Sequence, residues 1–156
     1  LNTQRKKLQE DSAKIAETMI NPEDPFILVW DKTFHEGIIW IVAGRLAEKY
    51  NKPTIIYAEN EETGFAVASL RSPEYASVID LLYASSDLLE RYGGHKQAGW
   101  LTIKIENIPA FHQTITTFSQ QRLLTSKEKK YEIDSILYPH EYTSESLEIS
   151  NIERRI

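Results

Sequence analysis

Cysteine is absent from this chain of 156 residues, and long apolar runs are absent as well. Without cysteine the chain forms neither disulfides nor thiolate metal sites, which is compatible with the cytoplasm. No apolar run approaches the ~20 residues needed to span a membrane, and no signal peptide opens the sequence. We therefore expect a cytoplasmic protein with no membrane partner.

Positive charge is also scarce, because 18 lysine and arginine residues face 23 aspartate and glutamate residues, for a net charge of −5. This balance argues against a uniformly basic nucleic-acid binder. Any binding of nucleic acid must use a local basic patch or a partner domain. The length suits one ordinary domain plus a fragment, or one domain with long flanking helices. Because the chain starts at Leu1 inside a helical pattern, we interpret it as a piece of a longer protein.

Hydrophobic periodicity alternates between the helical and the extended kind along the chain. Helices are expected over residues 2–20, 36–50, 74–92 and 109–124. Strands are expected over residues 25–30, 53–58, 65–70 and 100–105, the first as a continuous apolar run typical of a central strand and the third hairpinned to the second. The fold class is therefore α/β, with a mixed sheet flanked by helices and preceded by a long helix.

The segment Gly93-Gly94-His95-Lys96 combines features that suit a phosphate oxygen. Two adjacent glycines let peptide N–H groups approach a ligand closely. His95 can donate a hydrogen bond from a fixed place, and Lys96 adds positive charge. The alternative is that Gly93-Gly94 only caps the C-terminus of the preceding helix and leaves His95 exposed without a function.

Arg71 is the strongest candidate for a phosphate contact, because a guanidinium matches two phosphate oxygens. Ser69 lies two positions earlier, so both side chains face the same way on a strand. The alternative is a surface arginine paired with a carboxylate such as that of Glu74. His35 is expected mainly to cap or abut its helix. His112 and His140 are expected at the surface.

Three segments in order resemble motifs of one family. Residues 34–46 resemble the WHxGVIGIVASRL segment, residues 68–72 resemble the GSxRS motif, and residues 93–100 resemble the GGHxxAxG signature. The last is the signature of the DHH-associated domain in the DHH phosphoesterase superfamily. The first is more specific to the RecJ-like exonucleases, which degrade single-stranded DNA from its 5′ end.

The resemblance implies an organisation and a role for each part of the chain. Residues 1–21 would form a connecting helix, 22–126 the DHH-associated substrate-binding domain, and 127–156 a linker and the truncated start of an OB-type domain. The binding partner would be single-stranded DNA, beside the DHH and OB-type domains of the same protein. The residues that would grip the substrate phosphates are Ser69, Arg71, Gly93, Gly94 and His95, with His35, Lys96 and Trp100 as secondary candidates.

The metal ligands of the superfamily lie in its DHH domain, and no Asp-His-His or Asp-x-Asp sequence occurs here. The resemblance thus implies that manganese or magnesium and the hydrolysis of phosphodiesters belong to a domain outside this sequence. We expect this chain to bind no metal, to supply no catalytic residue beyond an assisting His95, and to be inactive alone. In the full protein the implied activity is that of a nuclease in DNA repair and recombination.

Departures from the family pattern keep other interpretations open. Trp40 and Trp100 stand where the family usually has glycine, Gly44 replaces a serine, and Ala68 replaces a glycine. The alternatives are a non-catalytic scaffold or binding module, and a relative acting on short oligonucleotides or dinucleotides. For Trp100 we expect inward packing, with Trp40 as a compensating partner, because an alternating strand begins there. In the second interpretation the indole overhangs the substrate and stacks on its bases.

Overall fold

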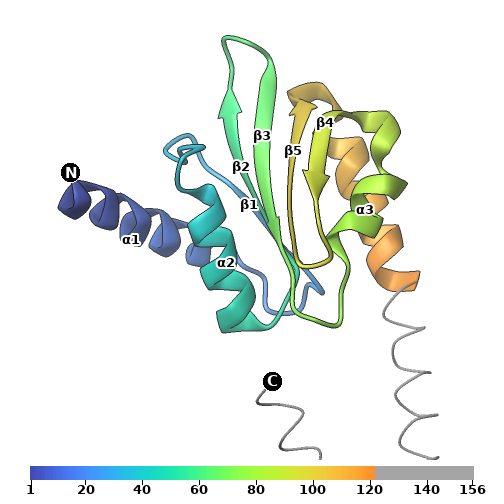
Figure 1. Ribbon diagram of the computed structural model, residues 1–156, viewed down its shortest axis with the longest axis horizontal. Helices are drawn as coiled ribbons and strands as arrows, with labels where there is room; N and C mark the ends of the chain where they lie inside the picture. Colours follow the sequence, from blue (N-terminus) through green and yellow to red (C-terminus); the bar gives the residue numbers. More distant parts are fainter. Residues whose placement is uncertain (122–156) are drawn as a thin grey trace, which may run out of the picture. The chain divides into compact units, whose positions relative to one another are not determined.

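The computed structural model describes residues 1–121, which form five strands and the helices around them (Figure 1). The helices are α1 (Asn2–Thr18), α2 (Ile39–Tyr50), α3 (Val78–Ala84) and a final helix over residues 108–121. The strands are β1 (Ile27–Trp30), β2 (Thr54–Asn60), β3 (Phe65–Arg71), β4 (Leu89–Gly94) and β5 (Ala98–Lys104). The interpretations of residues 127–156 and of His140 lie outside the described residues.

The strands form one sheet in the order β1-β2-β3-β5-β4. β1 and β2 are parallel and joined through α2, whereas the remaining neighbours are antiparallel. The expected mixed α/β sheet with flanking helices and a long first helix is thus confirmed. The hairpin between β2 and β3 is confirmed as well, with its turn before Gly64. None of the described helices has the length and apolarity that crossing a membrane requires.

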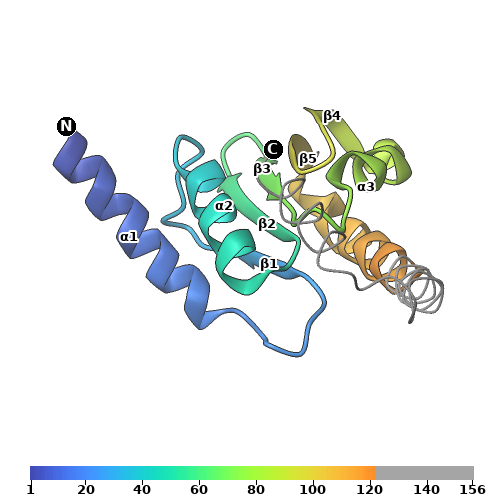
Figure 2. The ribbon, with the colours of Figure 1, turned by 60° about the horizontal axis from the view of Figure 1, so that its bottom comes forward.

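Each face of the sheet carries its own hydrophobic core. On one face, α1 and α2 pack against β1 and β2 through a cluster that includes Val42, Leu46 and Ile56. On the other face, α3 and the helix over 108–121 cover a cluster that includes Leu82, Leu101 and Phe111. Figure 2 shows the two groups of helices on their separate sides. α2 packs mainly on β2 and β3, and this leaves β5 and β4 with fewer neighbours on that side.

The prediction of a helix over residues 74–92 is wrong for the second half of that range. α3 ends at Ala84, a short 3-10 turn covers Ser86–Leu88, and residues Leu89–Gly94 form strand β4. Leucines at 88 and 89 fit a helical period, but β4 pairs with β5 and packs Leu89 and Tyr92 against the core. Tertiary pairing therefore overrides a local pattern that was compatible with both states.

β1 is an edge strand and not the central strand expected from its apolar run. Ile27 and Val29 are buried toward α1 and α2, while Leu28 is half-buried against the other core. The run is therefore apolar because helices cover both faces, although only β2 lies beside it. Trp30, at its end, is 47% exposed. α2 also starts later than expected, at Ile39, because residues before it form turns.

Candidate nucleic-acid interface

The pairing of β3 with β5 brings the segments over residues 68–72 and 93–100 together. Arg71 lies opposite Ala98, and Ser69 lies opposite Trp100. On the far side of β5, Trp100 also lies opposite Gly93. Ser69, Trp100 and Gly93 therefore form one row across three strands, on the sheet face toward α2. Two segments more than twenty residues apart in sequence thus share one surface.

Hydrogen bonds fasten the turn that carries His95 and Lys96 to the end of β3. The Ser72 N–H donates to the Gln97 carbonyl at 3.0 Å, and the Val78 N–H donates to the Lys96 carbonyl at 2.7 Å. The Ser72 hydroxyl donates to the Ala76 carbonyl at 3.0 Å and lies 3.4 Å from the Lys96 carbonyl. Ser72 is a positioning residue that we did not single out from the sequence, although it closes the motif over residues 68–72.

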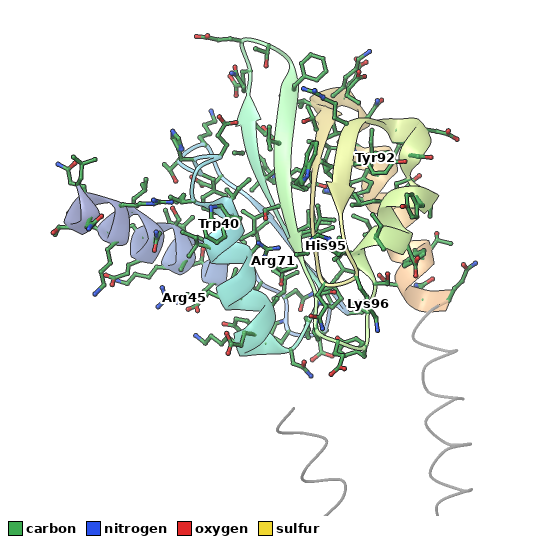
Figure 3. All side chains as sticks on the ribbon, in the orientation of Figure 1. Trp40, Arg45, Arg71, Tyr92, His95 and Lys96 are labelled. Carbon is green, nitrogen blue, oxygen red and sulfur yellow. The ribbon has the colours of Figure 1, made fainter. Side chains whose placement is uncertain are left out.

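The Arg71 side chain extends toward α2, since its Nε would lie 3.8 Å from a Cβ placed at Gly44 (Figure 3). Within residues 1–121 its guanidinium has no ion-pair partner, so the expected alternative of a pair with Glu74 is not observed there. The exposed imidazole of His95 likewise makes no hydrogen bond inside the described part of the chain. Ser69, by contrast, is 5% exposed. The unpaired Arg71 and His95 side chains are therefore more accessible to a ligand than the Ser69 hydroxyl.

Gly93 and Gly94 are the last residues of β4, and the alternative that they cap a helix is wrong. Gly94 has φ of 144°, and a Cβ there would overlap the Ala98 carbonyl oxygen across the hairpin. A Cβ at Gly93 would lie 3.0 Å from the indole Nε1 of Trp100. Gly94 thus requires glycine for close approach between β4 and β5, whereas a side chain at Gly93 would press against the indole of Trp100. Phosphate binding by their peptide groups remains a prediction.

His35 abuts α2, as one of its two expected structural roles, but does not cap it, because the N-cap is Ile38 and no side chain caps the helix. Its Nδ1 accepts a hydrogen bond from the Gly37 N–H at 3.1 Å, and its carbonyl accepts from the N–H groups of Ile38 and Ile39. The indole N–H of Trp40 in turn donates to the Gly37 carbonyl at 3.2 Å. These bonds shape the turns that lead into α2. A substrate contact by His35 remains a prediction.

The expectation that Trp100 packs inward is wrong, because its side chain is 47% exposed. Leu101 and Ile103 occupy the core-facing positions of β5, so alternation turns Trp100 to the opposite face, which α2 covers only as far as β3. Trp40, on α2, is 49% exposed. Within residues 1–121 no ring contact joins the two indoles, so they are not a compensating packed pair.

His112 is not the surface residue expected from the sequence. It is half-buried in the helix over 108–121, with its ring centroid 5.8 Å from that of Tyr57. Burial lowers the pKa of His112, and burial together with the Glu59 charge raises the pKa of Tyr57. Neither His112 Nε2 nor the Tyr57 hydroxyl has a hydrogen-bond partner in the described chain. This pair lies in the core opposite the phosphate motifs and belongs to the packing.

Metal ligands do not gather anywhere in residues 1–121. No three histidine, aspartate or glutamate side chains there come close enough to hold an ion. The donor set therefore does not fit the metal pair that phosphodiester hydrolysis of this type needs. The site that the described residues form is one of exposed cations and an exposed indole beside a sheet.

The fold and the paired motifs define a DHH-associated domain, and the family model described as the DHHA1 domain matches residues 23–121. The chain belongs to this family. Its relatives include the single-stranded-DNA-specific exonucleases RecJ of Thermus thermophilus, 30% identical over 119 residues, and of Bacillus subtilis, 27% identical over 126 residues. These alignments cover 76% and 79% of this chain but 17% and 16% of the relatives. The chain thus spans less than a fifth of their length.

Solved structures agree with this assignment. Exonuclease RecJ bound to manganese superimposes with a TM-score of 0.68 and 28% identity, over 76% of this chain and 29% of the other. RecJ of Thermus thermophilus in complex with Mg²⁺ gives 0.68 and 29%, over 77% and 18%. The pGpG-specific phosphodiesterase PggH of Vibrio cholerae shares the fold alone, at 0.55 and 16% identity over 75% and 40%.

Proposed function

We propose that this chain is the substrate-gripping domain of a RecJ-like exonuclease and holds single-stranded DNA by its phosphates. Arg71 and His95 donate to phosphate oxygens near the 5′ end, with Ser69, the glycines of β4 and Lys96 beside them. Hydrolysis takes place on a DHH domain that carries manganese or magnesium, and His95 assists there. An OB-type domain of the same cytoplasmic protein is the other partner, and DNA repair and recombination are the setting.

One observation carries this proposal. The β3–β5 pairing and the bonds of Ser72 place Arg71 and the His95 turn at the same end of the sheet, and neither side chain is neutralised within residues 1–121. An unpaired guanidinium suits a phosphate, because its planar fork of donors is pre-organised and loses less rotamer entropy for each hydrogen bond formed. Because the net charge of −5 disfavours nucleic-acid binding by the chain as a whole, these unpaired donors are the feature that supports binding at this end of the sheet.

Binding of oligodeoxythymidylate labelled at its 3′ end, followed by fluorescence anisotropy, tests the proposal. A charge-assisted contact contributes about 1.5–3 kcal/mol, so Arg71→Ala should weaken binding about tenfold or more. Loss of one phosphate contact should also reduce the slope of log affinity against log salt by about 0.7. If Arg71 holds the terminal phosphate, the advantage of a 5′-phosphorylated over a 5′-hydroxyl oligonucleotide should disappear in the variant.

Arg45→Ala is the matched control. Arg45 is an exposed arginine, whereas Arg71 is half-buried. Arg45 shares a flank of α2 with Lys49, which contacts Glu17 of α1 at 2.7 Å, and Figure 3 shows it on the side of α2 away from Arg71. Its loss should leave affinity and salt slope nearly unchanged. Unchanged affinity in both Arg71→Ala and His95→Ala would overturn the proposed function and favour a purely structural role for the motifs.

A further inference from the structure

Strands β5 and β4 present an open face on the side of α2, and Arg71 lies at its border, at the end of the covered strand β3. We define this open face by the residues Arg71, Arg91, Gly93 and Trp100. Trp100 and Gly93 are paired across β5 and β4, and Arg91 lies two residues before Gly93, so their side chains share one face. α2 packs on β2 and β3, and Trp100 retains 47% of its surface exposed.

The Trp100 indole packs on the backbone of Gly93. Three atoms of the indole, Nε1, Cε2 and Cζ2, would lie 3.0 to 3.2 Å from a Cβ at this position. The ring system therefore rests against the backbone of β4, where the absence of a side chain lets it approach. Its remaining surface is free of other aromatic rings within the described chain. An exposed aromatic surface with a fixed orientation loses little freedom when a flat ligand stacks on it.

The charge of these three strands is opposite to that of the chain as a whole. β3, β4 and β5 contain three cations, Arg71, Arg91 and Lys104, against a single carboxylate, Glu90. Lys104 is the cation near that carboxylate, with 3.9 Å between Nζ and Oε1. Arg71 and Arg91 have no ion-pair partner among residues 1–121. The open face is therefore complementary to a polyanion.

The register places the two arginines on opposite sides of the indole. Arg71 lies opposite Ala98, two residues before Trp100, and Arg91 lies opposite Thr102, two residues after it. With a rise of about 3.3 Å per residue, each arginine is displaced from Trp100 by roughly 7 Å along the strands. The order cation, aromatic, cation matches a strand of nucleic acid whose charged backbone runs beside an unpaired base.

We infer that single-stranded nucleic acid crosses the open face with one base stacked on Trp100 and its flanking phosphates on Arg71 and Arg91. This inference rests on the proposed function and adds a base contact and a second cation to it. Every base has an aromatic face, so the contact requires a base without selecting its identity. A base inside a duplex is already stacked and paired, and the contact therefore favours single strands.

A base-removal experiment tests the inference on the 156-residue chain. Oligodeoxythymidylate is compared with the same oligonucleotide carrying one abasic nucleotide at each position in turn, which keeps the phosphates and removes one base. At one position, base removal should weaken binding about fivefold to a hundredfold. In Trp100→Ala the intact oligonucleotide should bind as weakly, and base removal at that position should have no further effect, since both changes delete the same contact.

Fluorescence gives a second readout. The chain has three tryptophans, so the variant with Trp30→Phe and Trp40→Phe leaves Trp100 as the reporter. Its emission should be red-shifted in the free chain and quenched by the intact oligonucleotide, but not by the one abasic at the stacking position. Trp100→Leu, which keeps an apolar side chain, covers the case in which Trp100→Ala fails to fold, and it should lose the base-dependent affinity equally.

Trp30→Ala is the matched control, because Trp30 is also 47% exposed but pairs with Tyr57 of the opposite core. It should leave the base dependence intact, while Arg91→Ala should lower affinity and salt slope as Arg71→Ala does.

If Arg71→Ala weakens binding and the Trp100 and Arg91 variants do not, this inference is wrong and the proposed function stands. If no variant changes affinity, both are wrong. Blue-shifted emission from Trp100 that does not change when oligonucleotide is added would mean that protein covers the open face, and this result also overturns the inference.

Discussion

Gly94→Ala tests whether the end of the β4–β5 hairpin is held as the structure shows. At φ of 144°, a residue with a side chain costs about 1–3 kcal/mol. The new Cβ would also overlap the Ala98 carbonyl oxygen and the Gly99 Cα, which are backbone atoms that cannot rotate away. Relieving this overlap requires opening the hairpin, which weakens the 2.8 Å hydrogen bond from the His95 N–H to the Ala98 carbonyl. Loss of this bond costs about 0.5–1.5 kcal/mol more.

Part of this cost is returned, because alanine restricts the unfolded chain by about 0.4–1 kcal/mol relative to glycine. The expected net loss of unfolding free energy is therefore about 0.5–4 kcal/mol. At about 2–4 °C per kcal/mol for a chain of this size, the unfolding midpoint should fall by roughly 1–16 °C. Denaturant titration and thermal unfolding measure both quantities.

Gly64→Ala is the matched control for Gly94→Ala. Gly64 also has a positive φ, of 75°, but a Cβ there would meet no atom within 4 Å. Its substitution should cost only the left-handed backbone conformation less the gain in the unfolded state, about 1 kcal/mol or less. A loss in Gly94→Ala no larger than that in Gly64→Ala would refute the close approach of the two strands.

Two further predictions concern the chemistry and the packing. The purified 156-residue chain should release no nucleotides from single-stranded DNA with manganese or magnesium, because residues 1–121 gather no metal ligands; metal-dependent release that co-purifies with the chain would contradict this. Burial lowers the folded pKa of His112 below its ordinary 6.5, so the unfolded chain takes up a proton first as pH falls. The free energy of unfolding should therefore decrease as pH falls below about 6.5. His112→Gln should make that decrease smaller, whereas the control His95→Gln, at an exposed residue, should leave it unchanged. The same pH dependence in the unchanged chain and in both variants would contradict this prediction.

Local patterns in the sequence determined the fold class and indicated the candidate binding segments over residues 68–72 and 93–100. The apolar run of β1, the helical period of α2 and the turn before Gly64 each depend on neighbours close in the chain, so they specify their elements without tertiary information. The placement of Ser69 and Arg71 on one face followed from strand alternation alone. The similarity of three segments to one family then indicated which of the exposed cations to consider.

Tertiary structure decided which faces are covered and which strands are neighbours. Leu88 and Leu89 fit a helix as well as a strand, and only the partner β5 selects the strand. Alternation indicates that Trp100 points away from Leu101, but the reach of α2 decides that it points to solvent. His112 is half-buried because its helix packs on Tyr57. Periodicity records which residues share a face, whereas burial depends on contacts between segments distant in sequence, which local pattern does not encode.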